Sequence, residues 1–482
     1  MPIEGLTDQM RHESKFFGWQ AEGLPEMNIC VPHTVYPPRE DTQLLDRVIS
    51  RLGDGGRKCL LEIGCGSGAI AIAAALRGWN VMACDVNPLA VAASIGNATE
   101  QGCQENVEFH EGGPGEVARS WIPKNGADMI VWNLPYLDPL SEADDRLSAI
   151  EDAALIDAES GESLLAEIQE SPDLLRKGGV ILMLHSSNQT GTKLPSIWRK
   201  AGWATRIQDC EIVGDECLTV IAAWRPFEGI TPEFVDQCDS TNLRLLENNV
   251  PIGQLVQTLS QLQGRGQHGR TWVDSPEGFM GSWNIGINSI EGFAENLQMA
   301  ASVAIMDLFS ALLSLGLPSH SWRYCSDLGA RGLFVKWPND ICLKSSNGFS
   351  KIGGILAEGR TRGTEHRVVL GIGLNETGPS IDIQTAGWKD ITGLDQVESS
   401  QIVPILHASI ASVLEKHPRL IDQSFSNLMR SHYACMKMSF QNGVSKENVA
   451  IGINASGHLL LENGHLSSTD ELDWRWIQTS DS

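Results

Sequence analysis

Short apolar segments alternate with stretches of helical composition along the first half of the chain. The apolar segments have the length of single strands, and glycine, asparagine or proline commonly follows them. A strand–helix–strand order favours parallel pairing and places helices over a sheet. The pattern therefore predicts a doubly wound α/β sheet. The expected strands are residues 58–64, 80–86, 107–112, 127–136, 178–187 and 217–224.

The second half of the chain begins after a break in this pattern. Pro226 and Gly229 mark the end of the last strand of the first half. A second α/β region follows, and residues 446–464 are typical of a β-hairpin with its turn at 454–457. Because 482 residues exceed the size of one core, we expect several domains. The expected division is an extension over 1–29 and domains over 30–225, 230–432 and 436–482.

Composition and charge narrow the classes of function. A hydrophobic fraction of 42% is ordinary for a globular protein. No apolar run approaches the ~18 residues of a membrane span, and we expect no secretory signal at the start of the sequence. Eleven cysteines without a C-x-x-C motif predict neither a disulfide framework nor a zinc site, so we expect no protein-bound metal and a cytoplasmic location. A net charge of −24 argues against nucleic acid as a partner.

The ends of three predicted strands in the first half carry polar or glycine-rich motifs. LLEIGCGSG places Glu62 and a run of glycines before a helix, where the backbone can approach a ligand closely. Asp85 closes the next strand, where a carboxylate can accept hydrogen bonds from both hydroxyls of a ribose. The tetrapeptide NLPY, from Asn133 to Tyr136, can hold a planar –NH₂ group, although a strand that simply ends at proline is the alternative.

These motifs, together with VYPPREDTQLL at residues 35–45, resemble S-adenosylmethionine-dependent methyltransferases of the HemK type, in their archaeal and eukaryotic branch. The resemblance implies a Rossmann-like domain over 30–225 that methylates a glutamine amide of a protein such as a release factor. Asn133 would orient the nitrogen for direct displacement. The site residues it implies are Thr42, Glu62, Gly64, Gly66, Gly68, Asp85, Asn133, Pro135 and Tyr136.

One departure from that family keeps other interpretations open. Leu134 stands where the family fingerprint N-P-P-Y has its first proline, which lowers the stiffness of the segment. A domain that binds S-adenosylmethionine and regulates without catalysis is therefore an alternative. Amino groups of DNA or RNA are alternative methyl acceptors, because the pocket would accept any planar amine.

The second half carries an ordered set of motifs suited to adenylate chemistry. GRGQHGRTW at 264–272 can fold backbone amides and guanidinium groups around a phosphate, and Lys351 precedes a Gly-Gly pair. Forming an acyl-adenylate builds charge on the α-phosphate, so donors such as Arg265, Arg270 and Lys351 would do most of the work. Asp340 in KWPND could take or orient the proton of an acceptor amine, or could instead cap the adjacent turn.

With DSTN at 239–242 and with GIGLN at 371–375, this order closely resembles biotin protein ligases over most of residues 230–475. The resemblance implies an α/β catalytic domain followed by a small C-terminal β-barrel, and it allows a homodimer. It further implies ATP, Mg²⁺ and biotin, with the biotin carboxyl carrier domain of an acyl-CoA carboxylase as the protein partner. Lipoate-protein ligases share the architecture and are the nearest alternative. The ligand-binding residues it implies are Ser240, Thr241, Asn242, Gln261, Arg265, Gly266, Gln267, Lys351 and, on the adenine side, Asn375.

Gln267 stands where the family loop usually has a second arginine, and this difference generates a prediction. An amide in place of a guanidinium removes a charge-assisted hydrogen bond of about 1.5–3 kcal/mol. We therefore predict that biotinyl-adenylate leaves this chain faster than it leaves ligases with the arginine. Gln267→Arg should slow the measured dissociation of the intermediate, and an unchanged rate would contradict the prediction.

Overall fold

The computed structural model shows two compact units. Unit 1 comprises Met1–Ile197, Thr205–Trp224 and His417–Ile421, and unit 2 comprises Trp198–Ala204, Arg225–Lys416 and Asp422–Ser482. The structure describes residues 14–134, 161–187, 193–267, 272, 277–286, 293–316, 324–345, 348–362, 365–378, 385–421, 438–441, 448–454, 457–462, 464, 466–467 and 473–476. No helix in these ranges is long and apolar enough to cross a membrane.

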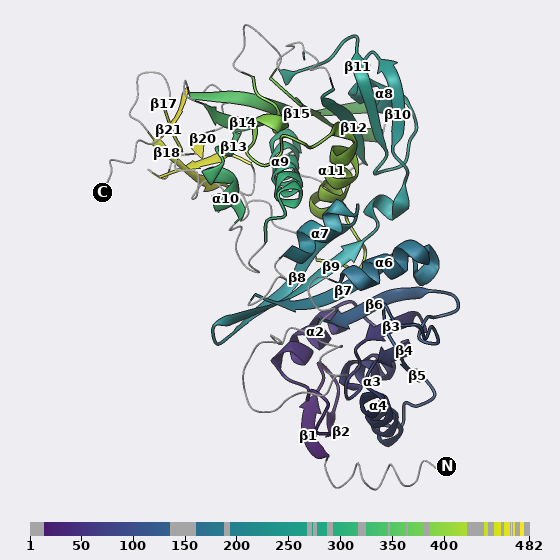
Figure 1. Cartoon of the computed structure of the whole chain (residues 1–482). Coiled ribbons are helices and arrows are strands. Elements are labelled where there is room, and N and C mark those ends of the chain that lie inside the picture. Colours follow the sequence, from purple (N-terminus) through teal and green to yellow (C-terminus); the bar gives the residue numbers. More distant parts are fainter. Residues whose placement is uncertain are drawn as a thin grey trace. The chain divides into compact units, whose positions relative to one another are not determined.

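Unit 1 is built on a seven-stranded sheet with the order β5-β4-β3-β6-β7-β9-β8 (Figure 1). The first five strands in this order pair in parallel, whereas β9 runs antiparallel to β7. The predicted α/β sheet is thus confirmed, and the antiparallel strand β9 makes it a mixed one. The strands are β3 (Cys59–Ile63), β4 (Asn80–Asp85), β5 (Val107–Glu111), β6 (Ala127–Asn133), β7 (Leu175–Ser186), β8 (Ala204–Val213) and β9 (Glu216–Trp224).

The helices of unit 1 follow from local sequence signals. In α4 (Pro88–Glu100) the Asn87 side chain accepts a hydrogen bond from Leu89 N at 2.9 Å, and proline occupies the first turn. Nearly all of α3 (Ala69–Leu76) is buried, which explains its continuous run of alanine and isoleucine. The remaining helical segments are α2 (Glu40–Arg51), α6 (Glu162–Glu170), the 3₁₀ turn Pro172–Leu174 and α7 (Leu194–Lys200), of which the part up to Ile197 belongs to unit 1.

A separate hairpin precedes α2. Its strands β1 (Lys15–Gln20) and β2 (Glu26–Val31) pair antiparallel, and the side chains of Trp19, Met27 and Ile29 are buried in the hydrophobic core of unit 1. Much of the expected extension over 1–29 therefore contributes to that core. Residues 1–13 lie outside the described ranges.

Unit 2 is built on a second seven-stranded sheet, with the order β10-β11-β12-β16-β15-β14-β13. Only β10 and β11 pair in parallel; the other neighbours are antiparallel. The strands are β10 (Glu233–Cys238), β11 (Leu255–Gln261), β12 (Phe279–Gly286), β13 (Leu333–Lys336), β14 (Asp340–Ser345), β15 (Gly348–Arg362) and β16 (Glu365–Leu374). The helical segments are α8 (Thr241–Glu247), α9 (Phe293–Leu312), α10 (Tyr324–Ala330), α11 (Ser399–Leu414) and the 3₁₀ turns Pro226–Gly229 and Trp388–Asp390.

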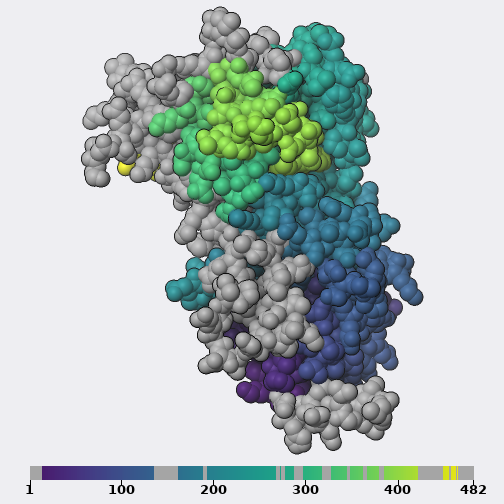
Figure 2. Space-filling view, viewed as in Figure 1, coloured from purple at the N-terminus to yellow at the C-terminus, as the bar shows by residue number. Residues whose placement is uncertain are grey.

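Helices cover both faces of this sheet. Leu245 of α8 packs against Val256 and Val369 on one face. On the other face, Trp283 Nε1 donates to His407 Nδ1 of α11 at 2.9 Å, and α9 lies beside α11 (Figure 1). Burial lowers the pKa of His407 to about 4, so the ring is neutral at pH 7 and its Nδ1 can accept. Residues 385–414, which include α11, form part of the surface in Figure 2.

The C-terminal strands form a five-stranded antiparallel sheet. Its order is β20-β19-β18-β17-β21, and within the described residues the outer strands β20 and β21 do not pair with each other, so the predicted barrel is not confirmed. The hairpin predicted over 446–464 is present as β18 and β19, and Asn454 closes its turn by accepting from His458 N at 2.9 Å. The strands are β17 (Met438–Gln441), β18 (Asn448–Ile453), β19 (Leu459–Leu461), β20 (Leu466–Ser467) and β21 (Asp473–Trp476).

Candidate functional site

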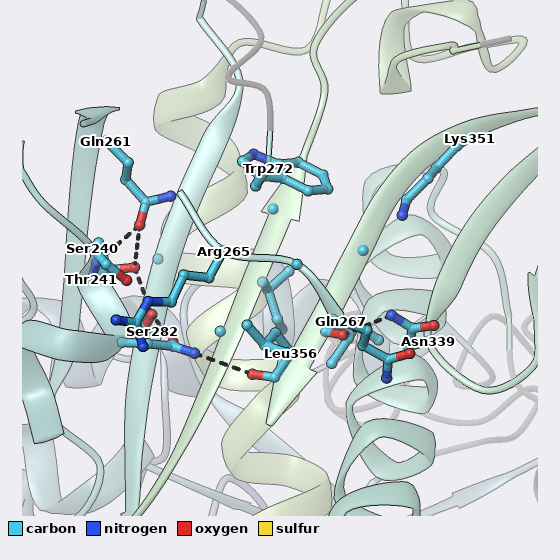
Figure 3. A pocket seen from close by; sticks show the side chains of 18 residues that line it. Ser240, Thr241, Gln261, Arg265, Gln267, Trp272, Ser282, Asn339, Lys351 and Leu356 are labelled. Carbon is cyan, nitrogen blue, oxygen red and sulfur yellow. Dashed lines mark hydrogen bonds between the residues drawn. The ribbon is translucent and has the colours of Figure 1, made fainter. Parts of the chain in front are cut away.

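A pocket lies on the α8 face of the unit 2 sheet (Figure 3). Most of the residues predicted for the ligase site line it, including the loop residue Arg265 and Lys351 of β15. Figure 3 shows Gln261 and Lys351 on opposite sides of the pocket, with Trp272 between them. The lining residues are Ser240, Thr241, Asn242, Gln261, Arg265, Gly266, Gln267, Trp272, Gly281, Ser282, Asn339, Lys351, Gly354, Ile355, Leu356, Gly371, Ile372 and Gly373.

The start of α8 supplies one wall of the pocket. Ser240 is the N-cap, and its hydroxyl accepts from Leu243 N at 3.5 Å. The next backbone amide, Thr241 N, donates to Gln261 Oε1 at 2.9 Å, so the two polar motifs of the sequence are joined directly. The side chains of Ser240, Thr241 and Asn242 are buried, which means that this wall is preformed.

A fully buried serine fixes the direction of the hydrogen bonds along this wall. Ser282 Oγ lies 2.6 Å from both Thr241 Oγ1 and Asn242 Oδ1. A hydroxyl has one proton and an amide oxygen can only accept, so Ser282 must donate to Asn242. The proton of Thr241 fills the other short contact when it points to Ser282, and the longer contact of Thr241 Oγ1 with Gln261 Oε1, at 3.3 Å, is then without a proton. This is the one assignment that places a proton in both short contacts. The Thr241 oxygen is then left with lone pairs and can accept from a ligand.

Glu358 extends this network to the glycine-rich loop. Its Oε2 accepts from Asn242 Nδ2 at 2.7 Å, and its Oε1 lies 3.2 Å from Arg265 Nη1. The carboxylate thus connects the buried amide to the half-exposed guanidinium. Arg265 keeps further N–H groups for a ligand, because a guanidinium has five donors.

Glycines of β15 and β16 form the floor of the pocket. The Trp272 ring lies so close to this floor that a Cβ at Gly373 would come within 2.5 Å of Cζ2, and one at Gly354 within 3.2 Å of Cζ3. A Cβ at Gly371 would lie 2.5 Å from Asn242 Oδ1. The conspicuous glycines of KIGGILAE and GIGLN therefore make room for two side chains that line the site.

Lys351 and Asp340, the donor and the carboxylate predicted for catalysis, lie together. Lys351 Nζ is 2.6 Å from Asp340 Oδ1 and 5.6 Å from the centre of the Trp272 ring. Asp340 also lies 3.9 Å from Lys336 Nζ and does not line the pocket itself. The turn before it is held by Asn339, whose Nδ2 donates to Ile355 O at 3.1 Å.

Three further residues of the ligase-like motifs do not line the pocket or fall outside the described residues. Asn375 is buried and is not among the lining residues; its Nδ2 donates to Lys351 O at 3.4 Å and to Ala386 O at 3.2 Å. It therefore ties the following loop to the backbone of Lys351. Trp337 of the KWPND motif is a core residue that donates to Gly457 O at 2.9 Å. Arg270 lies outside the described residues.

The second set of predicted residues gathers at the carboxyl edge of the unit 1 sheet. Gly64, Gly66 and Gly68 have φ of 69°, 55° and 80°, values that favour glycine and turn the chain from β3 into α3. Gly66 N donates to Asp85 Oδ2 at 2.8 Å, so the loop after β3 is fastened to the end of β4. Burial raises the pKa of Asp85.

Glu62 is buried beneath this loop. Burial raises the pKa of its carboxyl well above the usual value, and the neighbouring charge of Asp85 adds to the effect. Its Oε2 has no hydrogen-bond partner among the described residues. A buried oxygen of this kind costs stability unless something else pairs with it, so it indicates room for a polar ligand group.

Asn133 at the end of β6 shows the same feature. Its Nδ2 donates to Asp41 Oδ2 at 2.9 Å, whereas its Oδ1 is buried without a partner in the described part of the chain. Thr42 is buried beside Asp41, and its hydroxyl accepts from Arg39 N at 3.3 Å at the start of α2. Pro135 and Tyr136 lie outside the described residues.

The sequence did not single out three residues that organise these sites. Asp41 stood inside the quoted motif VYPPREDTQLL, beside the chosen residue Thr42, whereas Glu358 lies seven residues after Lys351, at the end of KIGGILAE. Ser282 stands in the apolar strand FMGSWNIG, where a lone serine gives no signal. Its contact with α8 depends on the pairing of β12 with β16, which brings Ser282 opposite Gly371.

The close contact between Trp272 and the floor gives a prediction. Gly373→Ala should lower the free energy of unfolding by about 1–3 kcal/mol, because the methyl group would overlap the indole. Gly359→Ala is the matched control, since a Cβ there would meet nothing nearer than 3.7 Å. Denaturant unfolding of both variants provides the measurement; equal effects of the two substitutions would be evidence against the packing described.

Comparison with known protein families is consistent with this division of the chain. Residues 234–375 match the model of the Biotin/lipoate A/B protein ligase family. Residues 41–150 match the model of Ribosomal protein L11 methyltransferase (PrmA). The first match covers biotin and lipoate ligases alike.

Individual relatives match the first half. A putative protein N5-glutamine methyltransferase of Methanocaldococcus jannaschii is 35% identical over 197 residues, which are 40% of this chain and 92% of the relative. A release factor glutamine methyltransferase of Neisseria gonorrhoeae is 33% identical over 171 residues, 33% of this chain and 58% of the relative.

Among solved structures, the biotin protein ligase from Aquifex aeolicus in complex with biotin and ATP is 19% identical, with a TM-score of 0.38, over 51% of this chain and 99% of that one. Through its first half this chain belongs to the family of protein N5-glutamine methyltransferases, and over residues 234–375 it carries a domain of the Biotin/lipoate A/B protein ligase family.

Proposed function

We propose that unit 2 joins biotin to ATP as biotinyl-5′-AMP and then transfers the biotinyl group to a lysine of a biotin carboxyl carrier domain. The observation that supports this most directly is that Arg265 and Lys351 line one pocket. Two cationic donors at one site suit a reaction in which charge builds on a phosphate. Mg²⁺ would accompany ATP as its counter-ion.

The polarity of the pocket favours biotin over lipoate. The Thr241 oxygen can accept a hydrogen bond because Ser282 takes up the proton of its hydroxyl. A ureido ring carries N–H groups that pair with such an acceptor, whereas a dithiolane ring has none. Since unpaired buried polar groups are costly, a dithiolane would leave this wall unsatisfied. A lipoate-type ligase remains the alternative.

The two half-reactions assign different work to the chain. In the first, the biotin carboxylate attacks the α-phosphorus and pyrophosphate leaves, while Lys351 and Arg265 bind the phosphate oxygens. In the second, the acceptor lysine attacks the carbonyl carbon, AMP leaves, and the amine must lose a proton. We assign that proton to Asp340, whose carboxylate is 2.6 Å from Lys351 Nζ and therefore also holds the ammonium group in place.

Lys351→Ala is the test of the ligase proposal. With ATP, labelled biotin and a carrier domain, the wild-type chain should label the carrier, and the variant should do so about 100-fold more slowly because a donor to the phosphate is lost. Lys344→Ala, at an exposed position of β14, is the matched control and should behave as the wild type. Absence of labelled carrier in the wild-type reaction would refute the assignment.

For unit 1 we propose methyl transfer from S-adenosylmethionine to the side-chain amide nitrogen of a protein glutamine, with a release factor as the acceptor protein. The buried, unpaired Oδ1 of Asn133 supports this proposal, since it can accept an N–H of a substrate amide. S-adenosylmethionine would supply an electrophilic methyl group. Asp85 retains lone pairs for ribose hydroxyls, and the unpaired Oε2 of Glu62 fits a further donor of the bound molecule.

The work of the chain in this reaction is positioning. Asn133 would hold the amide nitrogen in line with the methyl group, and the nitrogen would lose a proton as the new N–C bond forms. A domain that binds S-adenosylmethionine without turnover, and methylation of nucleic acid amino groups, are the alternatives. ATP and S-adenosylmethionine are metabolites of the cytoplasm, and we place the chain there. The homodimer that the resemblance to biotin protein ligases allows stays a prediction.

Asn133→Ala is the test of the methyltransferase proposal. Transfer of tritiated methyl to a release factor should fall about 100-fold, because the nitrogen loses its orientation, while binding of S-adenosylhomocysteine should stay close to wild type. Asn80→Ala removes an asparagine at the start of β4, at the other end of the strand from Asp85, where its Nδ2 donates to Arg57 O, and it should leave transfer unchanged. A wild-type chain that binds S-adenosylmethionine but methylates nothing would instead support the regulatory alternative.

A further inference from the structure

We propose that Asp41 is a positioning residue that sets which end of the Asn133 amide faces the methyl acceptor. The inference rests on the proposed methyltransferase activity and adds a determinant of specificity to it. Asp41 forces the NH₂ group of Asn133 toward itself, so the oxygen of Asn133 must face the substrate.

The geometry around Asp41 leaves one orientation for this amide. Asp41 is the second residue of α2, and its side chain is 1% exposed. Its Oδ1 accepts from Thr42 N at 2.6 Å and from the Thr42 hydroxyl at 3.2 Å. Its Oδ2 is then directed at Asn133 Nδ2 at 2.9 Å. An ionised carboxylate can only accept, so the group opposite must be a donor.

This constraint matters because an asparagine amide is almost symmetric in shape. Its oxygen and its NH₂ group occupy similar volumes, and a rotation of the amide exchanges an acceptor for a donor. A substrate glutamine presents N–H donors at the nitrogen that receives the methyl group. A rotated Asn133 would set donors against donors, and its oxygen would be forced against the Asp41 carboxylate.

A purely structural connection between α2 and β6 does not account for the arrangement. Such a connection would use the Nδ2 contact and leave the other end of the amide either exposed or paired. Here the Oδ1 atom is buried and has no partner among the described residues. An unpaired buried acceptor is costly, so an oxygen held in this state is expected where a ligand completes it.

The test is to exchange the carboxylate of Asp41 and the amide of Asn133, first singly and then together. In Asp41→Asn the group that faces Asn133 becomes an NH₂, so Asn133 should rotate and turn its own NH₂ toward the substrate. In Asn133→Asp two carboxylates would face each other. Each single variant should lose about 100-fold in methyl transfer to a release factor. The double variant restores one donor and one acceptor between the residues and leaves an oxygen facing the substrate, so it should recover at least about tenfold over either single variant.

Two further measurements separate positioning from loss of structure. Affinity for S-adenosylhomocysteine should remain close to wild type in all three variants, since neither residue is assigned to the cofactor by this inference. The melting temperature should fall in each single variant and recover in the double variant, which reports the hydrogen bond without any turnover. Glu40→Gln, which removes the exposed carboxylate of the residue before Asp41, should change neither methyl transfer nor the melting temperature.

The outcomes distinguish failure of this inference from failure of the proposed function. If the wild-type chain methylates a release factor and Asp41→Asn does so equally well, Asp41 has no positioning role. The same conclusion holds if the double variant is no more active and no more stable than the single variants. If the wild-type chain transfers no methyl group to any protein, the proposed function itself fails, and the inference falls with it.

Discussion

The ligase pocket depends on how closely side chains can approach the backbone of two adjacent strands. Gly354 of β15 and Gly371 and Gly373 of β16 have no Cβ, and Trp272 and Asn242 occupy the space that a Cβ would need. The backbone at these positions is ordinary sheet, so the requirement comes from contact with neighbouring side chains.

The two candidate sites orient a buried asparagine in the same way. In unit 2 the Nδ2 of Asn242 donates to Glu358, and in unit 1 the Nδ2 of Asn133 donates to Asp41. In each case a carboxylate, which can only accept, fixes the direction of an amide that could otherwise rotate. The difference lies at the other end of the amide. Ser282 satisfies the oxygen of Asn242, whereas the oxygen of Asn133 is unpaired within the described residues.

Sequence patterns were sufficient for the fold class and for most of the pocket. Alternation of strand and helix predicted the sheet of unit 1. The resemblance to biotin protein ligases implied a shared site for Thr241, Gln261 and Lys351, and all three line one pocket. Patterns were insufficient where a residue acts through strand register. Ser282 reaches the site only because β12 pairs with β16, and Asn375 is drawn away from it by hydrogen bonds to Lys351 and Ala386. Neither a pairing register nor a loop contact of this kind leaves a periodic signal.

The charge balance of the ligase pocket has a kinetic consequence. Among the described lining residues the charged side chains are Arg265 and Lys351, and each is already paired, with Glu358 and Asp340 respectively. The formal charges of these four groups cancel, and the chain as a whole carries −24. Long-range attraction therefore does not assist the capture of the anionic nucleotide proposed as ligand. The net charge of the chain repels it, so the association rate should rise as salt screens this repulsion. Selectivity must arise after encounter, when the ligand phosphate reaches the N–H groups of Arg265 and Lys351 that their carboxylate partners leave unoccupied.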